Sequence, residues 1–214
     1  MQDIIIVCAG SYGKEVYYEL LDINKAAKEN KGEDKYRLLG FLSDVPDALE
    51  GSGIELPILG TIQEWQPKSG EKYVLGLGKP ESKKKVAGLL KDRGAVFESV
   101  VSVFARVPKD LIMGEGCFIT SAMISCGVQL GDFVNINGSM LYGGAQIGDY
   151  STTTGFTVVE DAKVGVGVYL GSKSVVTQGC TVGNWVRVTA GSVITKDVQD
   201  GAMVFGMPAE EVIW

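Results

Sequence analysis

The stretch VVEDAKVGVGVYLGSKSVVTQGCTVGNWVRVTAGSVI, residues 158–194, decides the fold of this chain. Read from Val158 in steps of six, it has an aliphatic residue at each position: Val164, Leu170, Val176, Val182, Val188 and Ile194. An earlier segment shows the same period at Ile112, Phe118, Ile124, Leu130 and Ile136. A fixed period over this length indicates a repeat architecture. We therefore predict three short strands per turn of a parallel β-helix, with one buried residue in each hexad.

A β-sandwich fits this pattern poorly, because its strands recur every 8 to 12 residues and alternate with period two. The hexad period itself has two faults. Ile136 and Ile147 are eleven residues apart, and so are Ile147 and Val158. Both faults border SMLYGGAQIGDY, residues 139–150. Two interpretations stay open: a working face of the solenoid, or a deletion at a corner, which glycine tolerates. The glycines concerned are Gly143, Gly144 and Gly155.

Residues 1–100 are built differently, since strand-like and helix-like stretches alternate along them. IIIV (4–7), YRLLGFLS (36–43), LPILG (56–60) and KYVLGLG (72–78) have the character of strands. KEVYYELLDINKAAK (14–28) and KKKVAGLLKDRG (83–94) have helical spacing. This alternation predicts a small parallel sheet of βαβ units. The chain is therefore predicted to be α/β at residues 1–100 and all-β at residues 101–214.

Composition limits the function. The net charge of −6 and pI near 4.8 argue against nucleic-acid and anionic-membrane partners and favour a small polar ligand. The N-terminus shows no signal sequence or membrane-spanning segment, so we expect a cytoplasmic protein. The chain has no His, and its cysteines lack CxxC pairing, so we expect no metal. We predict buried, reduced thiols at Cys8, Cys117, Cys126 and Cys180.

The segment CAGSYGK, residues 8–14, links the first predicted strand to the first predicted helix. Gly10 and Gly13 lie at the start of the helix, where backbone N–H groups and the helix dipole favour a phosphate. Cys8 stands where a dinucleotide fingerprint has its first Gly, which favours a mononucleotide diphosphate over NAD. Asp44 either contacts a ribose or base or caps a turn. Lysines near these segments either reach phosphates or are solvated: Lys14 and Lys79.

Several segments together carry a family resemblance. IVCAGSYGKEV, LLGFLSD, LPILG and LGLGKPESKKK are followed by LGDFVNIN, IGDYST, VTAGSVITKDV and GMPAEEVI. In this order the chain resembles the hexapeptide-repeat sugar acetyltransferases of the sialic acid O-acetyltransferase type, a group that includes bacterial UDP-amino-sugar N-acetyltransferases. The resemblance covers essentially the whole chain. It implies a small Rossmann-like domain that binds a nucleotide-sugar, UDP- or CMP-linked, and a left-handed β-helix. The implied substrate-binding residues are Gly10, Ser11, Tyr12, Gly13, Lys14, Asp44, Gly60, Gly78 and Lys79.

The resemblance also implies acetyl-CoA as co-substrate, bound along a groove toward the C-terminus, and a homotrimer. A lone β-helix with walls of Val and Ile would expose one apolar face, which threefold packing would bury. The residues that match the acetyl-CoA site are Gly171, Ala190, Gly191, Ser192, Gly206 and Pro208. Their alternative role is corner geometry. Where similar proteins have Lys or Arg after PA, this chain has Glu210 and Glu211, which oppose an anionic cofactor.

Proteins of this group carry a catalytic His followed by Asp or Glu four residues before IG, and those positions here are Gly143 and Gly144. Two further positions that are often His are Ser102 and Thr152. A positioned base typically contributes about 10² to 10⁴-fold to rate. A hydroxyl acceptor needs that help, whereas a free amine is already a nucleophile. Substitute bases, or ordinary surface and turn residues, are Tyr142, Asp149, Glu160 and Asp161.

The sequence thus predicts an acetyl-CoA-dependent acetyltransferase acting on a nucleotide-activated amino sugar in bacterial glycan biosynthesis, with its usual His base missing. Two alternatives remain open. A catalytically impaired homologue would serve as a sugar-nucleotide-binding or scaffold protein, and an acyltransferase would use a different donor or acceptor.

Overall fold

The structure of the chain, a computed structural model, describes residues 1–212. The chain forms two compact units. The first unit comprises residues 1–78 and 82–103, and the second comprises residues 79–81 and the chain from Phe104 onward. Each unit is described by itself below.

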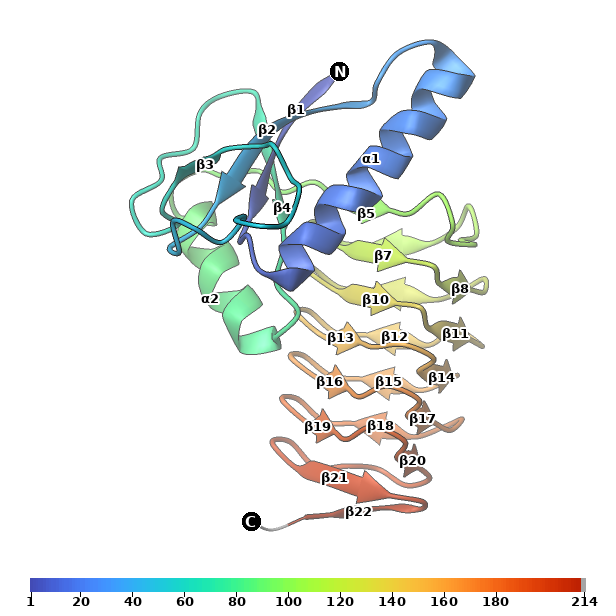
Figure 1. The fold of residues 1–214 in the computed structure, drawn as a ribbon. Helices are drawn as coiled ribbons and strands as arrows, with labels where there is room; N and C mark the ends of the chain where they lie inside the picture. The colour runs from blue at the N-terminus through green and yellow to red at the C-terminus, as the bar shows by residue number, and fades with distance from the viewer. Residues whose placement is uncertain (213–214) are drawn as a thin grey trace. The chain divides into compact units, whose positions relative to one another are not determined.

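The first unit is built on a four-stranded parallel sheet (Figure 1). Its strands are β1 (Gln2–Val7), β2 (Tyr36–Leu42), β3 (Ile58–Gly60) and β4 (Glu71–Leu75), in the order β3-β2-β1-β4. Strand β5 (Val100–Val101) lies among the last residues of the unit. Ile4 to Val7 are 0% exposed, so β1 is buried at the centre of the sheet. Strands β2 and β3 are added in sequence on one side of β1, and β4 is then added on the other side. The order of the strands therefore reverses between β1 and β4, which makes this place a topological switch point.

Two helices belong to this part of the chain, α1 (Ser11–Lys31) and α2 (Pro80–Lys91). Helix α1 buries a stripe at helical spacing, Gly13, Val16, Leu20 and Ile23, which is what fixes its orientation. It ends at Gly32, whose φ of 80° allows its N–H to donate to the carbonyl of Lys28. The predicted helices are both present, and α1 begins three residues earlier than its spacing indicated.

The second unit is a parallel β-solenoid with three strands in each regular turn (Figure 1). Its first face contains β7 (Phe118–Thr120), β10 (Asn135–Asn137), β13 (Thr152–Thr153), β16 (Tyr169–Leu170), β19 (Arg187–Val188) and β21 (Met203–Gly206). Its second face contains β8 (Met123–Ile124), β11 (Met140–Tyr142), β14 (Val158–Glu160), β17 (Val175–Val176) and β20 (Val193–Ile194). Its third face contains β6 (Ile112–Met113), β9 (Gln129–Leu130), β12 (Gln146–Ile147), β15 (Lys163–Val164) and β18 (Thr181–Val182). Strand β22 (Ala209–Glu211) pairs antiparallel with β21 and ends the solenoid.

The predicted six-residue repeat is confirmed, but its phase is wrong at three positions. Strand register places Met113, Ile119 and Val159 in the interior rows, in place of the predicted neighbours Ile112, Phe118 and Val158. Ile112 is 63% exposed and Met113 is 36% exposed, whereas Val159 is 0% exposed. Phe118 is buried as predicted, at 1% exposure, although Ile119 takes the interior row. The error has a simple cause, because in each pair both adjacent residues are apolar and hydropathy alone cannot tell the inner one from the outer one.

The turns differ in length, as the faults in the period indicated. From Leu130 to Ile147 and from Ile147 to Val164 each turn takes 17 residues, and from Val164 to Val182 it takes 18. The corner that follows Val159 is one residue shorter than the corner that follows Leu141 on the preceding turn. The predicted second fault therefore lies after Val159, on the turn next to Gly143 and Gly144.

The outer surfaces of the second and third faces have opposite character. Along the second face one outward row is entirely apolar, namely Met123, Met140, Val158, Val175 and Val193, although Glu160 at the end of β14 is exposed. We call this the apolar face. Along the third face the outward residues from β9 to β18 are polar and exposed: Gln129, Gln146, Lys163 and Thr181.

Of the four cysteines, all are free thiols, and Cys117 and Cys180 are buried as predicted. The prediction is wrong for Cys126, which is exposed, and for Cys8, which is half-buried. Cys126 sits at a corner of the solenoid, where side chains point to solvent. Among residues 1–212, no helix is long and apolar enough to cross a membrane. Within the same residues, no group of three potential metal-ligating side chains comes together.

Candidate functional site

The turn from β1 to α1 brings three pieces of backbone into close approach. The N–H of Gly76, just after β4, donates to the carbonyl of Val7 at 2.8 Å. A Cβ on Gly13 would lie 1.9 Å from the carbonyl oxygen of Cys8, and one on Gly76 would lie 2.6 Å from the Cα of Gly13. Only glycine fits at both positions. The first turn of α1 is therefore held directly against the ends of β1 and β4.

Cys8 adopts a left-handed backbone conformation, with φ of 83°. This conformation suits glycine and costs another residue roughly 1–2 kcal/mol. Its N–H donates to the carbonyl of Leu42 at 2.8 Å, which holds the residue in place. The sequence comparison with dinucleotide fingerprints thus identified a position whose backbone does require glycine-like angles, although the residue present is Cys.

The N-terminus of α1, the positive end of the helix dipole, has no side-chain cap and no acidic residue beside it. Gly10 is the N-cap and provides no side-chain cap, and the first turn has no acidic residue. Ser11 is exposed, so the end of the helix is open to solvent at that residue. Burial raises the pKa of Glu15, and the charge of Glu19 adds to this effect, so the first nearby carboxyl holds its proton more readily than usual. These features favour an anion at the helix N-terminus.

The remaining predicted nucleotide-sugar residues divide into two groups. Tyr12 lies against Gly78, since a Cβ on Gly78 would be 3.5 Å from the Tyr12 ring. These two residues therefore belong with the β1–α1 turn. Asp44 is exposed, and its Oδ1 accepts a hydrogen bond from the Ile62 N–H at 2.8 Å, which is the capping role left open by the sequence. Gly60 accepts from the Ser43 N–H at 3.0 Å and pairs with β2.

Two lysines complete the predicted set. The N–H of Lys14 donates to the carbonyl of Gly10 at 3.0 Å, which is the first hydrogen bond of α1. Lys79 follows Gly78 in the chain but belongs to the second unit. The β1–α1 turn therefore unites Gly10, Ser11, Tyr12, Gly13, Lys14 and Gly78.

The turn at Gly143 and Gly144, where the sequence predicts the position of the catalytic pair, has a left-handed backbone. Both glycines are left-handed, with φ of 61° and 79°. A Cβ on Gly143 would lie 2.8 Å from the Cβ of Asp161 on the next turn of the solenoid. The Asp161 N–H donates to the carbonyl of Tyr142 at 3.0 Å, which keeps the two turns in contact. No ionisable side chain is present at either glycine.

Strand register shows which residues take the equivalent positions on the neighbouring turns. Strand register aligns Gly143 with Cys126 on the preceding turn, and Gly144 with Gly127. Cys126 does not share the positive φ of Gly143. Asp161, which aligns with Gly143 on the following turn, also has a positive φ, of 41°, so left-handed residues recur at this corner of the solenoid.

None of the possible substitute bases has an arrangement typical of a catalytic base. Asp149 Oδ1 accepts from the Asp132 N–H at 2.9 Å, as part of a ladder that fixes one corner of the solenoid. Asp161 Oδ2 accepts from Gln178 Nε2 at 3.0 Å, and the Tyr142 hydroxyl contacts Met123 Sδ at 3.5 Å. Glu160 is exposed. The other two positions that are often His in similar proteins, Ser102 and Thr152, are buried at 3% and 1% exposure.

The predicted acetyl-CoA residues form a corner of small side chains. A Cβ on Gly171 would lie 2.6 Å from the Ala190 backbone nitrogen, so this glycine is needed for close stacking of turns. Ser192 is 0% exposed, and its Oγ accepts from the Gly206 N–H at 3.3 Å. Gly191 is exposed, and nothing lies within 4 Å of the position of its Cβ. The corner is therefore open to solvent at Gly191.

Two further observations concern the end of the solenoid. Pro208 follows a cis peptide bond in the hairpin between β21 and β22. Glu210 forms an ion pair with Lys196 at 2.9 Å, and both side chains are exposed. The carboxylate that we expected to oppose an anionic cofactor is therefore partly neutralised, while Glu211 has no such ion pair within residues 1–212.

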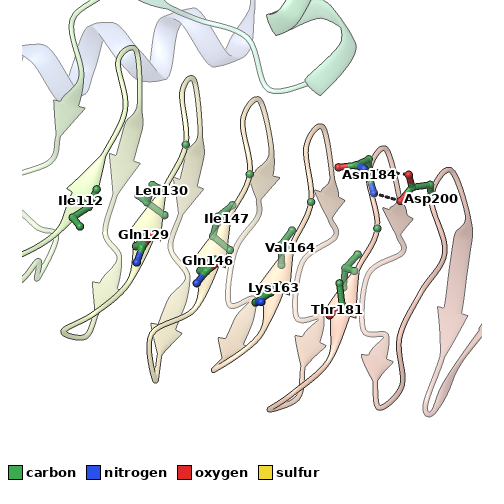
Figure 2. Close-up of a pocket in the computed structure, with 15 residues that line it drawn as sticks. Ile112, Gln129, Leu130, Gln146, Ile147, Lys163, Val164, Thr181, Asn184 and Asp200 are labelled. Carbon is green, nitrogen blue, oxygen red and sulfur yellow. Dashed lines mark hydrogen bonds between the residues drawn. The ribbon is translucent and has the colours of Figure 1, made fainter.

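A groove of about 460 Å³ follows the third face of the solenoid (Figure 2). Gln129, Gln146, Lys163 and Thr181 line it in strand order, and Asn184 and Asp200 lie at its end. Four glycines also line it: Gly131, Gly148, Gly165 and Gly183. A Cβ at each of them would lie within 2.8 Å of an atom on the next turn, so the turns pack closely there. None of the residues predicted to bind acetyl-CoA lines this groove.

Sequence reasoning missed a second pocket, of about 480 Å³, on the first turns of the apolar face. It is lined in part by Arg106, Lys109, Cys126 and Tyr142. The sequence did contain one relevant signal. Cys126 and Gly143 are 17 residues apart, which is the length of one turn, so the spacing places Cys126 next to the Tyr142–Gly143 segment on the following turn.

No protein-family model matches the chain, and no curated protein matches it in sequence. Its structure is similar to that of the acetyltransferase domain of PglB from Neisseria gonorrhoeae FA1090, solved with acetyl coenzyme A, at 21% identity and a TM-score of 0.82, covering 99% of both chains. WeeI from Acinetobacter baumannii AYE is similar at 22% identity and a TM-score of 0.79, covering 99% of this chain and 100% of the other. PerB from Caulobacter crescentus, solved with CoA and GDP-perosamine, is similar at 19% identity and a TM-score of 0.60, covering 100% and 98%. The chain therefore shares the fold of these proteins over its whole described length, which confirms the predicted β-helix fold.

Proposed function

We propose that this chain is a cytoplasmic, acetyl-CoA-dependent acetyltransferase that acts on a nucleotide-activated amino sugar in bacterial glycan synthesis. The observation that carries the proposal is the β1–α1 turn. Gly13 and Gly76 pack an uncapped helix N-terminus against the switch point of a parallel sheet. Ligands of such sheets bind at this place, and phosphate groups suit this helix end. Fold neighbours with this architecture include one solved with acetyl coenzyme A and one solved with CoA and GDP-perosamine.

The corner at Gly191 and Ser192 would hold the pantetheine chain of acetyl-CoA, whose thioester supplies an activated acetyl group. The fit rests on the open space at Gly191 and on the small side chains around it. The Lys196–Glu210 pair removes part of the charge conflict near the phosphates. Gly206 and Pro208 shape the hairpin that closes this end of the solenoid.

The lack of a base at Gly143 and Gly144 favours an amine over a hydroxyl acceptor. An amine that is partly deprotonated near neutral pH attacks without help, so transfer would depend on positioning of the two substrates. The same absence favours the alternative function, a sugar-nucleotide-binding or scaffold protein. Close packing at Gly143 supports this alternative too, because a Cβ there would lie 2.8 Å from the Cβ of Asp161.

We further propose that the chain assembles as a homotrimer through the part of the apolar face from Met140 to Val193, which leaves the pocket at Met123 and Cys126 outside the interface. This outward row contains no polar side chain, and a contiguous apolar stripe of this kind is typical of an interface. Light scattering that gives three chains per particle at micromolar concentration supports this assembly, and a 22.8 kDa monomer contradicts it.

Calorimetric titration with acetyl-CoA and, separately, with a UDP- or CMP-linked amino sugar tests the proposed function, together with an assay of acetyl transfer to that sugar. Binding of both ligands with transfer supports the enzyme. Binding of the nucleotide-sugar alone, without transfer, supports the scaffold alternative. Failure to bind either ligand contradicts both functions.

A further inference from the structure

The pocket on the first turns of the apolar face lies beside the turn at Gly143 and Gly144. Tyr142, which precedes Gly143, lines the pocket together with Cys126. The Ser125 N–H donates to the carbonyl of Leu141 at 2.9 Å, so the two turns are stacked in register there. All residues that line the pocket lie between positions 106 and 142, within the second unit.

The charges of the pocket are of one sign. Arg106 and Lys109 both line it, both are exposed, and neither forms an ion pair with any residue of the described chain, 1–212. No acidic side chain is among the residues that line the pocket. Both cations border the same pocket, in a chain whose net charge is −6. Their mutual repulsion is relieved when an anion binds between or beside them.

The shape and remaining lining of the pocket limit the ligand to a small molecule. A volume of about 480 Å³ is within the usual range for ligand sites. Arg106 is fixed by its backbone, which pairs with Met123 and accepts from the Ile124 N–H at 2.9 Å. The Tyr142 hydroxyl donates to Met123 Sδ at 3.5 Å, so an aromatic ring and a thioether lie together in the lining of the pocket. These two groups suit the C–H face of a sugar ring or a similar apolar group.

We propose that this pocket is an oxyanion-binding site for a small molecule that also carries an apolar or sugar-like part. Arg106 supplies a planar fork that matches a carboxylate or phosphate, and Lys109 supplies a second positive charge. The site is separate from the helix N-terminus of α1 and from the corner at Gly191. It stands on the geometry of the pocket and does not depend on the acetyltransferase function.

Cys126 provides a built-in reporter for this site, because it is the exposed thiol of the four and lines the pocket. Its alkylation rates by iodoacetate, an anion, and by iodoacetamide, a neutral analogue, are measured by mass spectrometry of the full chain. The ratio of the two rates should fall about threefold or more in the double variant Arg106→Gln, Lys109→Gln, because the nearby positive charge is gone. Lys163→Gln removes an equal type of charge from the third face and should leave the ratio unchanged.

Protection of Cys126 then identifies the oxyanion. Inorganic phosphate or pyrophosphate tests for a phosphate ligand, glucuronate tests for a carboxylate ligand, and glucose serves as the neutral control. Millimolar oxyanion should slow alkylation in the wild-type chain by iodoacetamide, and the double variant should lose this protection. Protection by one class alone assigns the chemistry of the ligand.

Two results would overturn the proposal. One is a rate ratio that does not change in the double variant. The other is equal protection by glucose and by the oxyanions, or none by any of them. If the double variant does not fold, the wild-type chain still decides the matter. Raising the salt to about 0.5 M should reduce the iodoacetate preference, because screening weakens exposed charges, and a preference that is absent at low salt contradicts the proposal.

Discussion

The two turns that the sequence marks as functional both depend on glycine, but for different physical reasons. At the β1–α1 turn, Gly13 is required by space, because its Cβ would lie 1.9 Å from the Cys8 carbonyl oxygen. At the solenoid turn, Gly143 and Gly144 are favoured by backbone angles, with φ of 61° and 79°, and at Gly143 a Cβ would also lie 2.8 Å from the Asp161 Cβ. Around Gly144 there is room, since the nearest atom to its Cβ position is the Gly127 oxygen at 3.7 Å.

This difference shows how each turn responds to a change of side chain. In a turn closed by packing, an added atom displaces the strands and the helix that the turn joins. A turn set by backbone angles resists a side chain locally, while its neighbours stay in place. We therefore expect a substitution at Gly13 to disturb the whole N-terminal turn, and a substitution at Gly143 to disturb only its own turn and the adjacent Asp161.

The largest effect is expected from Gly13→Ala. The added Cβ collides with backbone, which cannot rotate away, so α1 must move off β1 and β4. Overpacking typically costs about 1–3 kcal/mol, and we expect a value at the upper end because the contact is with main chain. We expect a large fall in the denaturation midpoint of the N-terminal unit, measured by circular dichroism in urea.

Gly88→Ala in α2 is the matched control for this variant. Gly88 is also a helical glycine, but nothing lies within 4 Å of its Cβ position. The substitution should stabilise the helix by roughly 1 kcal/mol, because Ala has the higher helix propensity. A Gly13→Ala protein that is as stable as Gly88→Ala would show that the close approach at Cys8 is not required.

A medium effect is expected from Gly143→His. The new side chain must adopt a left-handed backbone and approach Asp161, which together cost about 1–3 kcal/mol. Cys126→His is the matched control, since it places the same side chain one turn away at an exposed residue without positive φ. That variant should stay within about 0.5 kcal/mol of the wild type.

Urea denaturation of the two His variants measures the difference. Equal stability would mean that the turn at Gly143 relaxes readily to the backbone of its neighbour at Cys126. In that case the missing imidazole would be a matter of side chain alone, and the comparison between the two turns would lose its basis.

The sequence was sufficient for the repeat, the βαβ alternation and the glycine turn, because each leaves a periodic or local signal. It was insufficient for the phase of the repeat, since Ile119 and Val159 have apolar neighbours that look equally suited to the interior. It did not separate the two roles of Asp44, because a capping hydrogen bond to Ile62 depends on a residue 18 positions away. The pocket at Arg106 and Cys126 was missed because it forms only when turns of the solenoid stack.

The smallest effect on folding, with a clear effect on binding, is expected from Ser11→Asp. An aspartate in the first turn of α1 is favourable to the helix dipole by about 0.3–1 kcal/mol, so stability should be unchanged or slightly higher. The same charge occupies the electropositive end that the proposed diphosphate needs. We expect the affinity for the nucleotide-sugar to fall about tenfold or more, because the new carboxylate would accept hydrogen bonds from the helix N–H groups in place of the phosphate and would repel it.

Ser11→Asn keeps the size and polarity of the aspartate without its charge, and it should retain most of the affinity. Calorimetry of both variants with the nucleotide-sugar, and with acetyl-CoA as an internal reference, separates the possible outcomes. Loss of nucleotide-sugar binding in Ser11→Asp alone, with acetyl-CoA binding kept, places the diphosphate at α1. If Ser11→Asp binds the nucleotide-sugar as well as the wild type does, the ligand does not use this helix end. The turn at Gly13 would then be a packing device, and the contrast with the turn at Gly143 would be one of structure without consequence for function.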